Sequence, residues 1–260
     1  MNRLYGTPPY VAAFIHGGPG APGSLARAAR EFARYSGKGV MEPLQSGYTI
    51  RELIDELAAQ LEKGCPAGEK TVLVGHSWGA LLSVLYAAEH PRHVRRLVLV
   101  GCPPFEEKYV PRILQRRLAR LSAAEADIFR KTLERLENGE AGALKILESL
   151  VEKTDNYARR PEEKEHVLPP DGRMYGQVWN EARKLRFEGK LTLALKRLEC
   201  PVTVIHGDVD PHPAEGVLEP LENSGIPFEK FILPQCGHSP FDEREASESF
   251  CRTLERIICR

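Results

Sequence analysis

Short apolar runs alternate with longer amphipathic stretches along most of this chain. Runs typical of buried strands occupy residues 11–15, 39–41, 70–74, 97–100, 202–205 and 228–233, and the run at 39–41 is short and weak. Apolar residues with helical spacing occupy 25–35, 49–63, 78–90, 214–222 and 241–258. Strands that alternate with helices form parallel sheets with both faces covered. The pattern therefore predicts an α/β protein with a mostly parallel sheet flanked by helices.

The expected helix over residues 49–63 has the clearest start signal. Thr49 can cap it, and Glu52 follows three residues later, which is the spacing of a capping box. Gly64 and Pro66 are typical of its end. The first nine residues contain no apolar run, so we expect the first strand near Tyr10 and no secretory signal.

The alternation stops after the strand expected at 97–100 and resumes with the strand expected at 202–205. The segment between shows only helical periodicity, and it is far too long for a loop. We predict a division into an α/β core of residues 1–102 and 199–260 and a helical cap of residues 103–198. Ligands of open α/β sheets bind beyond the carboxyl ends of the strands. Functional residues are therefore expected directly after strands.

Charge and composition exclude several classes of protein. The chain has 36 basic and 36 acidic side chains and a formal net charge of zero, which favours neither nucleic acid nor an anionic membrane as a partner. No run reaches the roughly 18 apolar residues that a membrane-spanning helix needs. The six cysteines lack C-x-x-C spacing, so we expect free thiols and a cytoplasmic location. No feature of the sequence sets an oligomeric state.

Residues 75–79, Gly-His-Ser-Trp-Gly, match the G-x-S-x-G motif. They lie between a buried strand and a helix, which is the context that this motif requires. On such a turn the serine is forced toward positive φ. The two glycines relieve crowding there, and the amide of Trp78 points with the helix N-terminus toward the space before Ser77. The motif predicts that Ser77 is a nucleophile.

A serine nucleophile needs a base and a group that orients the base. The strand over 228–233 is followed by His238, and the strand over 202–205 is followed by Asp210. The chain order serine, acid, histidine is that of α/β-hydrolases. We predict His238 as the base and Asp210 as the acid, with Asp208 as the weaker alternative. Asp208, Asp210 and His212 also form a weak metal-ligand pattern, but a triad needs no metal, and we expect neither metal nor cofactor.

Residues 16–20, His-Gly-Gly-Pro-Gly, follow the first predicted strand and could supply an electrophilic site. Acyl transfer places negative charge on a carbonyl oxygen, which two backbone amides can stabilise. We predict an oxyanion hole formed by Trp78 and Gly18, with Gly17 as the near alternative. His16 is expected to hydrogen-bond to backbone near this turn, and His76 to pack beneath Ser77.

With these motifs the chain resembles α/β-hydrolase fold serine hydrolases with a helical cap. Residues 16–20 and 75–79, continuing through Tyr86 to His90 and Pro91, resemble the proline iminopeptidase-like branch. The resemblance implies Ser77 as nucleophile, Asp210 as acid, His238 as base, and Trp78 with Gly17 or Gly18 as oxyanion hole. Three features depart from that branch: almost nothing precedes the first strand, the usual Asp-x-Arg-Gly-x-Gly-x-Ser stretch is replaced by residues 40–46, and His76 stands where a glycine is common.

The expected function is cleavage of a small-molecule ester or amide through an acyl-enzyme, with an esterase favoured. The alternatives are a proline iminopeptidase-type aminopeptidase and a ligand-binding homologue without catalysis. Acidic cap residues could hold the free amine of a peptide; they are Glu106, Glu107 and Glu125. The arginines of the first cap helix are expected on a solvated face; they are Arg112, Arg116, Arg117 and Arg120. Tyr175 and Trp179 are expected in core packing.

Overall fold

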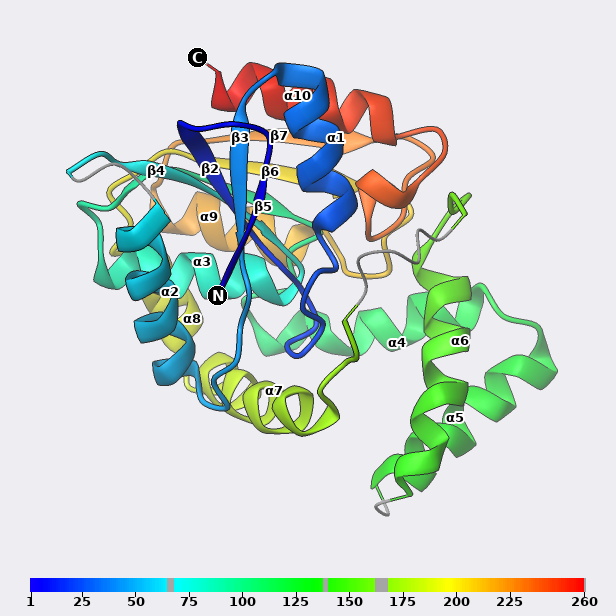
Figure 1. The fold of residues 1–260 in the computed structure, drawn as a ribbon. Coiled ribbons are helices and arrows are strands. Elements are labelled where there is room, and N and C mark those ends of the chain that lie inside the picture. The colour runs from blue at the N-terminus through cyan, green and yellow to red at the C-terminus, as the bar shows by residue number, and fades with distance from the viewer. Residues whose placement is uncertain (65–67, 138–139, 162–167, 260) are drawn as a thin grey trace.

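The computed structural model describes residues 1–64, 68–137, 140–161 and 168–259 (Figure 1). Within these residues a seven-stranded sheet has the order β1-β3-β2-β4-β5-β6-β7. All neighbouring strands from β3 to β7 are parallel, and β1 is antiparallel to β3. The strand bounds are β1 Asn2–Tyr5, β2 Tyr10–Ile15, β3 Gly39–Pro43, β4 Thr71–His76, β5 Val94–Val100, β6 Val202–Gly207 and β7 Phe228–Leu233. The prediction of a mostly parallel sheet flanked by helices is confirmed.

Strand β1 was not predicted, and the expectation that the first strand begins near Tyr10 is wrong. Its four residues carry no continuous apolar run, because it is an edge strand that pairs only with β3. Antiparallel backbone pairing, from Asn2 opposite Pro43 to Tyr5 opposite Val40, holds it in the sheet. Such pairing leaves no periodic signal in so short a segment.

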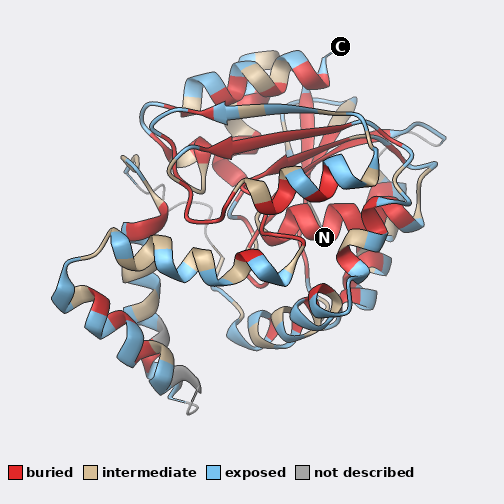
Figure 2. Ribbon diagram, turned by 180° about the vertical axis from the view of Figure 1, so that it is seen from behind, coloured by how far each residue is buried: buried red, intermediate tan, exposed pale blue. Residues whose placement is uncertain are grey.

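Two apolar layers cover the sheet. Helices α1 (Ala26–Ser36) and α10 (Ser247–Ile258) lie together on one face. The opposite face is covered by α2 (Ile50–Gly64), α3 (Trp78–Glu89), α8 (Lys190–Leu195) and α9 (Glu215–Ser224). Figure 2 colours the central strands as buried along most of their length, and every residue of β4 and β6 is buried. This burial explains why the sequence of these strands is a continuous apolar run rather than an alternating one.

The predicted capping box begins α2. The Thr49 hydroxyl accepts from the Glu52 amide at 3.2 Å, and the Glu52 carboxylate accepts from the Thr49 amide at 3.0 Å. The Ile50 amide donates at 2.8 Å to Glu181, which belongs to the helical segment between β5 and β6 that we call the insert. The start of α2 is thus set locally and is then tied to the insert. Cys65 and Pro66 lie outside the described residues.

The segment between β5 and β6 is helical, as predicted. It contains short 3₁₀ turns at Glu107–Tyr109 and Ala141–Ala143 and the helices α4 (Val110–Ala119), α5 (Ala123–Glu137), α6 (Leu144–Asp155), α7 (Gly172–Phe187) and α8. Helices α5 and α6 pack on each other and extend away from the sheet, whereas α7 and α8 lie against α2 and α3 (Figure 1). We keep the division into a core and a cap as a proposal.

The last helix begins later than predicted. A 3₁₀ turn at Pro240–Asp242 precedes it, and α10 starts at Ser247. The buried carboxylate of Glu243 lies in the intervening stretch and accepts from the amides of Tyr157, Ala158 and Gly237. These bonds, with the bond from the Arg244 amide to the Ala158 carbonyl oxygen, hold this stretch against distant backbone.

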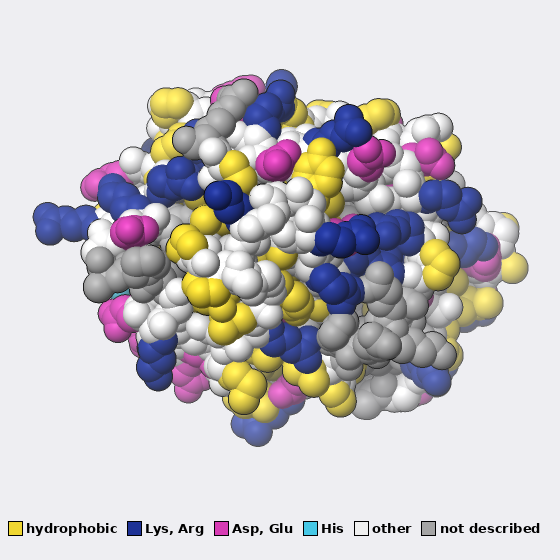
Figure 3. Space-filling model, turned by 45° about the horizontal axis from the view of Figure 1, so that its top comes forward, with side chains coloured by type: hydrophobic (Ala, Val, Ile, Leu, Met, Phe, Trp, Pro, Cys, Tyr) yellow, Lys and Arg dark blue, Asp and Glu magenta, His cyan; other side chains and the backbone are white. Residues whose placement is uncertain are grey.

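The described residues contain no helix long and apolar enough to cross a membrane. On the face drawn in Figure 3, Lys and Arg side chains are interspersed with acidic and apolar ones. This mixture fits the equal numbers of basic and acidic residues in the chain.

Candidate active site

Ser77 lies in a sharp turn between β4 and α3. Its backbone has φ of 53° and ψ of −123°, the positive φ that the motif predicts. A β-carbon at Gly75 would approach the Gly79 carbonyl oxygen to 2.4 Å, and one at Gly79 would approach the Ile15 carbonyl oxygen to 2.0 Å. Side chains are therefore excluded at both positions, which lets the turn be tight enough to project Ser77 from the end of the sheet.

Asp210 and His238 meet beyond the ends of β6 and β7. His238 Nδ1 lies 2.9 Å from Asp210 Oδ2, and the carboxylate is completely buried. Asp208 does not compete for this place, because it is exposed and accepts from the Cys236 amide at 3.1 Å. The structure thus brings together the acid and the base that the sequence pairs.

Ser77 adjoins this pair through its neighbour His76. The rings of His76 and His238 have centroids 4.9 Å apart, and His76 Nε2 lies 3.1 Å from the His238 carbonyl oxygen. Within the described residues the Ser77 hydroxyl makes no hydrogen bond, to His238 or to any other group. In proteins without substrate this bond is often long and shortens only in the substrate complex.

The electrostatics of the pair suit a base and its orienting acid. Burial opposes ionisation of Asp210, but the imidazoles of His238, His212 and His206 hold its pKa well below the usual range. Burial also lowers the pKa of His238, and the Asp210 carboxylate outweighs this effect and raises it. Because an ionised carboxylate can only accept, His238 carries its proton on Nδ1. Its Nε2 is then free to accept a proton.

His212 contacts both Asp210 and His238, which the sequence pattern did not predict. The pattern indicated it only as a weak metal ligand, yet its Nδ1 lies 2.8 Å from Asp210 Oδ1 and its ring stacks on His238 with centroids 4.3 Å apart. A histidine two residues after the acid is the signal that could have identified it. In the described residues, Asp210, His212 and His238 form the cluster with the spacing of metal ligands, and Asp208 does not join it.

The glycine turn after β2 lies against Ser77. A β-carbon at Gly17 would stand 3.1 Å from Ser77 Cβ, and Gly18 has φ of 95°. His16 accepts from the Gln45 amide through Nε2 at 3.1 Å, as expected of a residue that supports this turn. Trp78, the first residue of α3, is buried and donates from its indole to Gln45 at 2.9 Å. The two predicted oxyanion segments therefore flank Ser77 and share Gln45 as a support.

The arginines of α4 do not form a solvated face, so that expectation is wrong. Arg116 and Arg120 donate to the backbone carbonyls of Asp210 and Val209 at 3.4 and 3.0 Å, in the loop that carries the acid. Arg117 forms a two-pronged ion pair with Asp155 at 2.8 and 2.5 Å. Arg112 alone has only an exposed partner, Glu215. The helical periodicity of α4 is confirmed, but its basic side faces Asp155 and the loop that carries Asp210.

Asp155, at the end of α6, connects the insert to the predicted base. Its carbonyl oxygen accepts from the His238 amide at 2.7 Å. A β-carbon at Gly237 would approach the same oxygen to 2.1 Å, so the two segments are in close contact. The insert therefore helps to hold the loop of the base. Nothing in the sequence pattern alone indicated this role.

The other insert residues singled out from the sequence are placed as follows. Glu106 pairs with Lys108, and Glu125 pairs with Lys153 and caps α5 through Ser122. Glu107 is exposed. The Trp179 ring packs edge-on against Trp78 with centroids 5.9 Å apart, and Tyr175 is 49% exposed. Trp179 thus fits the expected packing, whereas Tyr175 is half in solvent.

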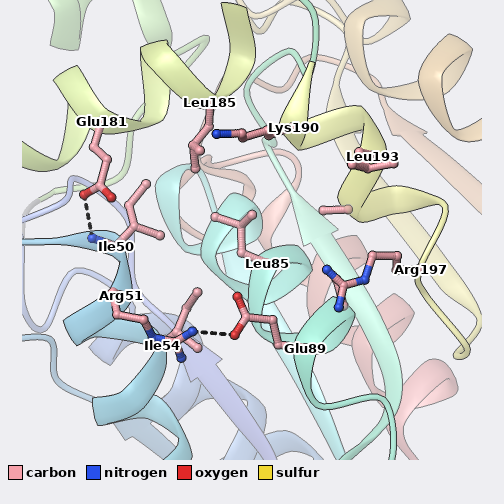
Figure 4. A pocket seen from close by; sticks show the side chains of 12 residues that line it. Ile50, Arg51, Ile54, Leu85, Glu89, Glu181, Leu185, Lys190, Leu193 and Arg197 are labelled. Carbon is pink, nitrogen blue, oxygen red and sulfur yellow. Dashed lines mark hydrogen bonds and ion pairs between the residues drawn. The ribbon is translucent and has the colours of Figure 1, made fainter. Parts of the chain in front are cut away.

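A pocket of about 360 Å³ lies among α2, α3, α7 and α8 (Figure 4). Its walls include Ile54, Leu85 and Leu185, and the Arg51–Glu89 ion pair crosses its rim at 2.6 Å. None of the residues of the predicted triad lines it.

A sequence model of the alpha/beta hydrolase fold family matches residues 14–245. The chain belongs to this family. Among curated proteins, a cis-3-alkyl-4-alkyloxetan-2-one decarboxylase of Shewanella oneidensis is 36% identical over 66 residues, which are 25% of this chain and 20% of that protein. The chain therefore matches only about a fifth of that relative's length.

Solved structures share the fold over nearly the whole chain. VinJ has a TM-score of 0.72 at 19% identity, covering 99% of this chain and 93% of VinJ. The proline iminopeptidase of Mycobacterium smegmatis has a TM-score of 0.64 at 18% identity, with the same coverage. Est816, an N-acyl homoserine lactone degrading enzyme, has a TM-score of 0.61 at 16% identity, covering 99% and 96%. At these identities the likeness concerns the fold alone.

Proposed function

We propose that this chain is a serine hydrolase that cleaves an ester or amide bond of a small molecule through an acyl-enzyme. The observation that carries the proposal is the 2.9 Å contact between Asp210 and His238 beside a serine at positive φ. Membership of the α/β-hydrolase family supports it. Buried free thiols such as Cys102 and Cys236 suit a cytoplasmic setting.

In the proposed reaction the Ser77 hydroxyl attacks the substrate carbonyl carbon while its proton moves to His238 Nε2. The carbonyl oxygen becomes negatively charged and binds the amides of Trp78 and of Gly18 or Gly17. His238 gives the proton to the leaving alcohol or amine as the bond breaks. Water then attacks the acyl-serine, with its proton taken by His238, and the acid is released as Ser77 is regenerated.

We favour an ester over a peptide with a free amine as the substrate. An aminopeptidase needs an acidic group left free to bind the substrate ammonium. Glu106, Glu125 and Asp155 already have basic partners, whereas Glu107 is exposed and stays available for this role. The likeness to a proline iminopeptidase keeps that activity as the second candidate.

A fluorophosphonate probe tests the proposal directly. We expect covalent labelling of the wild type and none in Ser77→Ala, because the probe reacts with an activated serine. Circular dichroism on both proteins controls for folding. A folded wild type that stays unlabelled would instead favour a ligand-binding protein without catalysis.

The bond type is tested with two chromogenic substrates. We expect p-nitrophenyl acetate to be hydrolysed with a higher kcat/KM than prolyl-p-nitroanilide. A preference for the prolyl amide would reverse the choice between esterase and aminopeptidase.

A further inference from the structure

Asp210 is shared by two imidazoles. Its Oδ2 accepts from His238 Nδ1 at 2.9 Å, and its Oδ1 accepts from His212 Nδ1 at 2.8 Å and from the His212 amide at 2.9 Å. A triad requires only the first of these bonds. The second imidazole occupies the carboxylate oxygen that the base does not use.

His212 is itself held in place. Its carbonyl oxygen accepts from His206 Nε2 at 2.8 Å, and its residue is only 9% exposed. Burial, followed by the nearby His238, lowers the pKa of His212 to about 4. His212 is therefore neutral near pH 7, and because Asp210 is ionised it donates from Nδ1. It supplies a hydrogen bond without adding a positive charge beside the base.

The ring of His212 also covers one face of the base. The two imidazoles stack with an interplanar angle of 29°. Other titratable or charged groups face the imidazoles or Asp210: His206 beside Asp210, His76 before Ser77, Arg117 of α4, Asp155 at the end of α6, Cys102 after β5 and Cys236 before His238. In the described residues, His212 and His238 are the rings hydrogen-bonded to the carboxylate, and His206 Nε2, which donates to the His212 carbonyl oxygen, lies 3.4 Å from Asp210 Oδ2.

We propose that His212 is a positioning residue that fixes the Asp210 carboxylate and limits the basicity that this carboxylate confers on His238. The inference rests on the proposed function, because it concerns the same acid and base. A carboxylate that accepts from two imidazoles attracts each proton less than one that accepts from a single imidazole. Its rotation is also restricted, so His238 is held in one orientation.

Two substitutions separate the hydrogen bond from the ring. His212→Phe keeps a flat ring for stacking and loses the Nδ1 donor. His212→Asn keeps a nitrogen donor near the Nδ1 position and loses the ring. His90→Phe, at a stacked pair of imidazoles on the far end of α3, is the matched control.

The measurements are the pH profile of kcat/KM, the separate values of kcat and KM, and the titration of His238 by NMR. For His212→Phe we expect the acid limb to move upward by about 0.5–1 pH unit and kcat to fall about tenfold, with KM within about twofold. For His212→Asn we expect an acid limb close to that of the wild type. His90→Phe should resemble the wild type in every measurement.

The proposal is overturned if the acid limb and kcat of His212→Phe equal those of the wild type. It is equally overturned if both His212 variants lose kcat with the acid limb unmoved, which is the result of a merely structural role. Should His212→Phe not fold, His212→Ala removes the same donor for comparison with His212→Asn. If the wild type is not labelled by the fluorophosphonate, the proposed function fails, and the NMR titration of His238 still tests His212.

Discussion

The Asp210 carboxylate accepts more hydrogen bonds than the proposed catalytic acid requires, and these bonds depend on its being ionised. Both imidazoles reach it through Nδ1, at 2.8 and 2.9 Å, and the Asp210 carboxylate is completely buried. An ionised carboxylate satisfies both donors, because each oxygen can accept. A neutral amide at this position satisfies only one of them, since its nitrogen is itself a donor.

Asp210→Asn is therefore expected to keep the fold and to lose activity. The amide nitrogen would face one of the two imidazoles and favour its wrong tautomer. We expect turnover to fall by about four orders of magnitude, as in other triads. Steady-state hydrolysis of p-nitrophenyl acetate measures the loss, and circular dichroism checks the fold. Near-normal turnover would contradict the assignment of Asp210 as the acid.

At the scale of elements, α4 and the end of α6 hold the two loops that carry Asp210 and His238, the proposed acid and base. Arg120 and Arg116 bind the acid loop, and Asp155 binds the His238 amide. The Arg117–Asp155 ion pair fixes Asp155 in that position, with side chains 21% and 8% exposed. The loops are thus supported by the insert as well as by the sheet.

Arg117→Met is expected to reduce both stability and activity. It leaves the buried Asp155 carboxylate unpaired, and we expect the free energy of unfolding to fall by about 1–3 kcal/mol. Turnover should fall as well, because the Asp155 carbonyl holds His238.

Arg112→Met is the control. It makes the same change at an ion pair with side chains 41% and 45% exposed, and should lower the free energy of unfolding by less than about 1 kcal/mol. Urea unfolding and ester hydrolysis measure both; equal effects of the two substitutions would argue against this role of Arg117.

The elements differ in how far the sequence predicts them. Strands such as β4 and β6 are buried on both faces, so they require continuous apolar runs that are visible locally. The turn at Ser77 is also visible, because two glycines and a serine at fixed spacing are local requirements. Strand β1 and the contacts of the α4 arginines depend on partners distant in the chain. The sequence identified His212 only as a residue of a metal-binding type. Its contact with Asp210 could not be predicted, since it depends on how the loop folds.

At the scale of the whole molecule, the site makes the protein sensitive to acid. His16, His76 and His212 are buried, and burial is the largest cause that lowers their pKa values, to about 4, about 3 and about 4. In the unfolded chain a histidine titrates near its ordinary pKa of about 6.5. Below that pH these histidines bind protons in the unfolded chain but not in the folded protein, so acid favours unfolding.

We therefore expect the free energy of unfolding to fall as the pH decreases from about 6.5 to 4.5. Each of the three histidines contributes a slope of at most about 1.4 kcal/mol per pH unit between about pH 6.5 and its folded pKa. His238 acts in the opposite direction at higher pH, because its raised pKa adds stability as the pH falls through that value; below about pH 6.5 its contribution is constant. The low pKa of Asp210 affects stability only at lower pH, where the carboxylate of the unfolded chain becomes protonated. Urea unfolding at a series of pH values measures the slope. A free energy that stays constant from about pH 6.5 to 4.5 would mean that these histidines become protonated inside the folded protein.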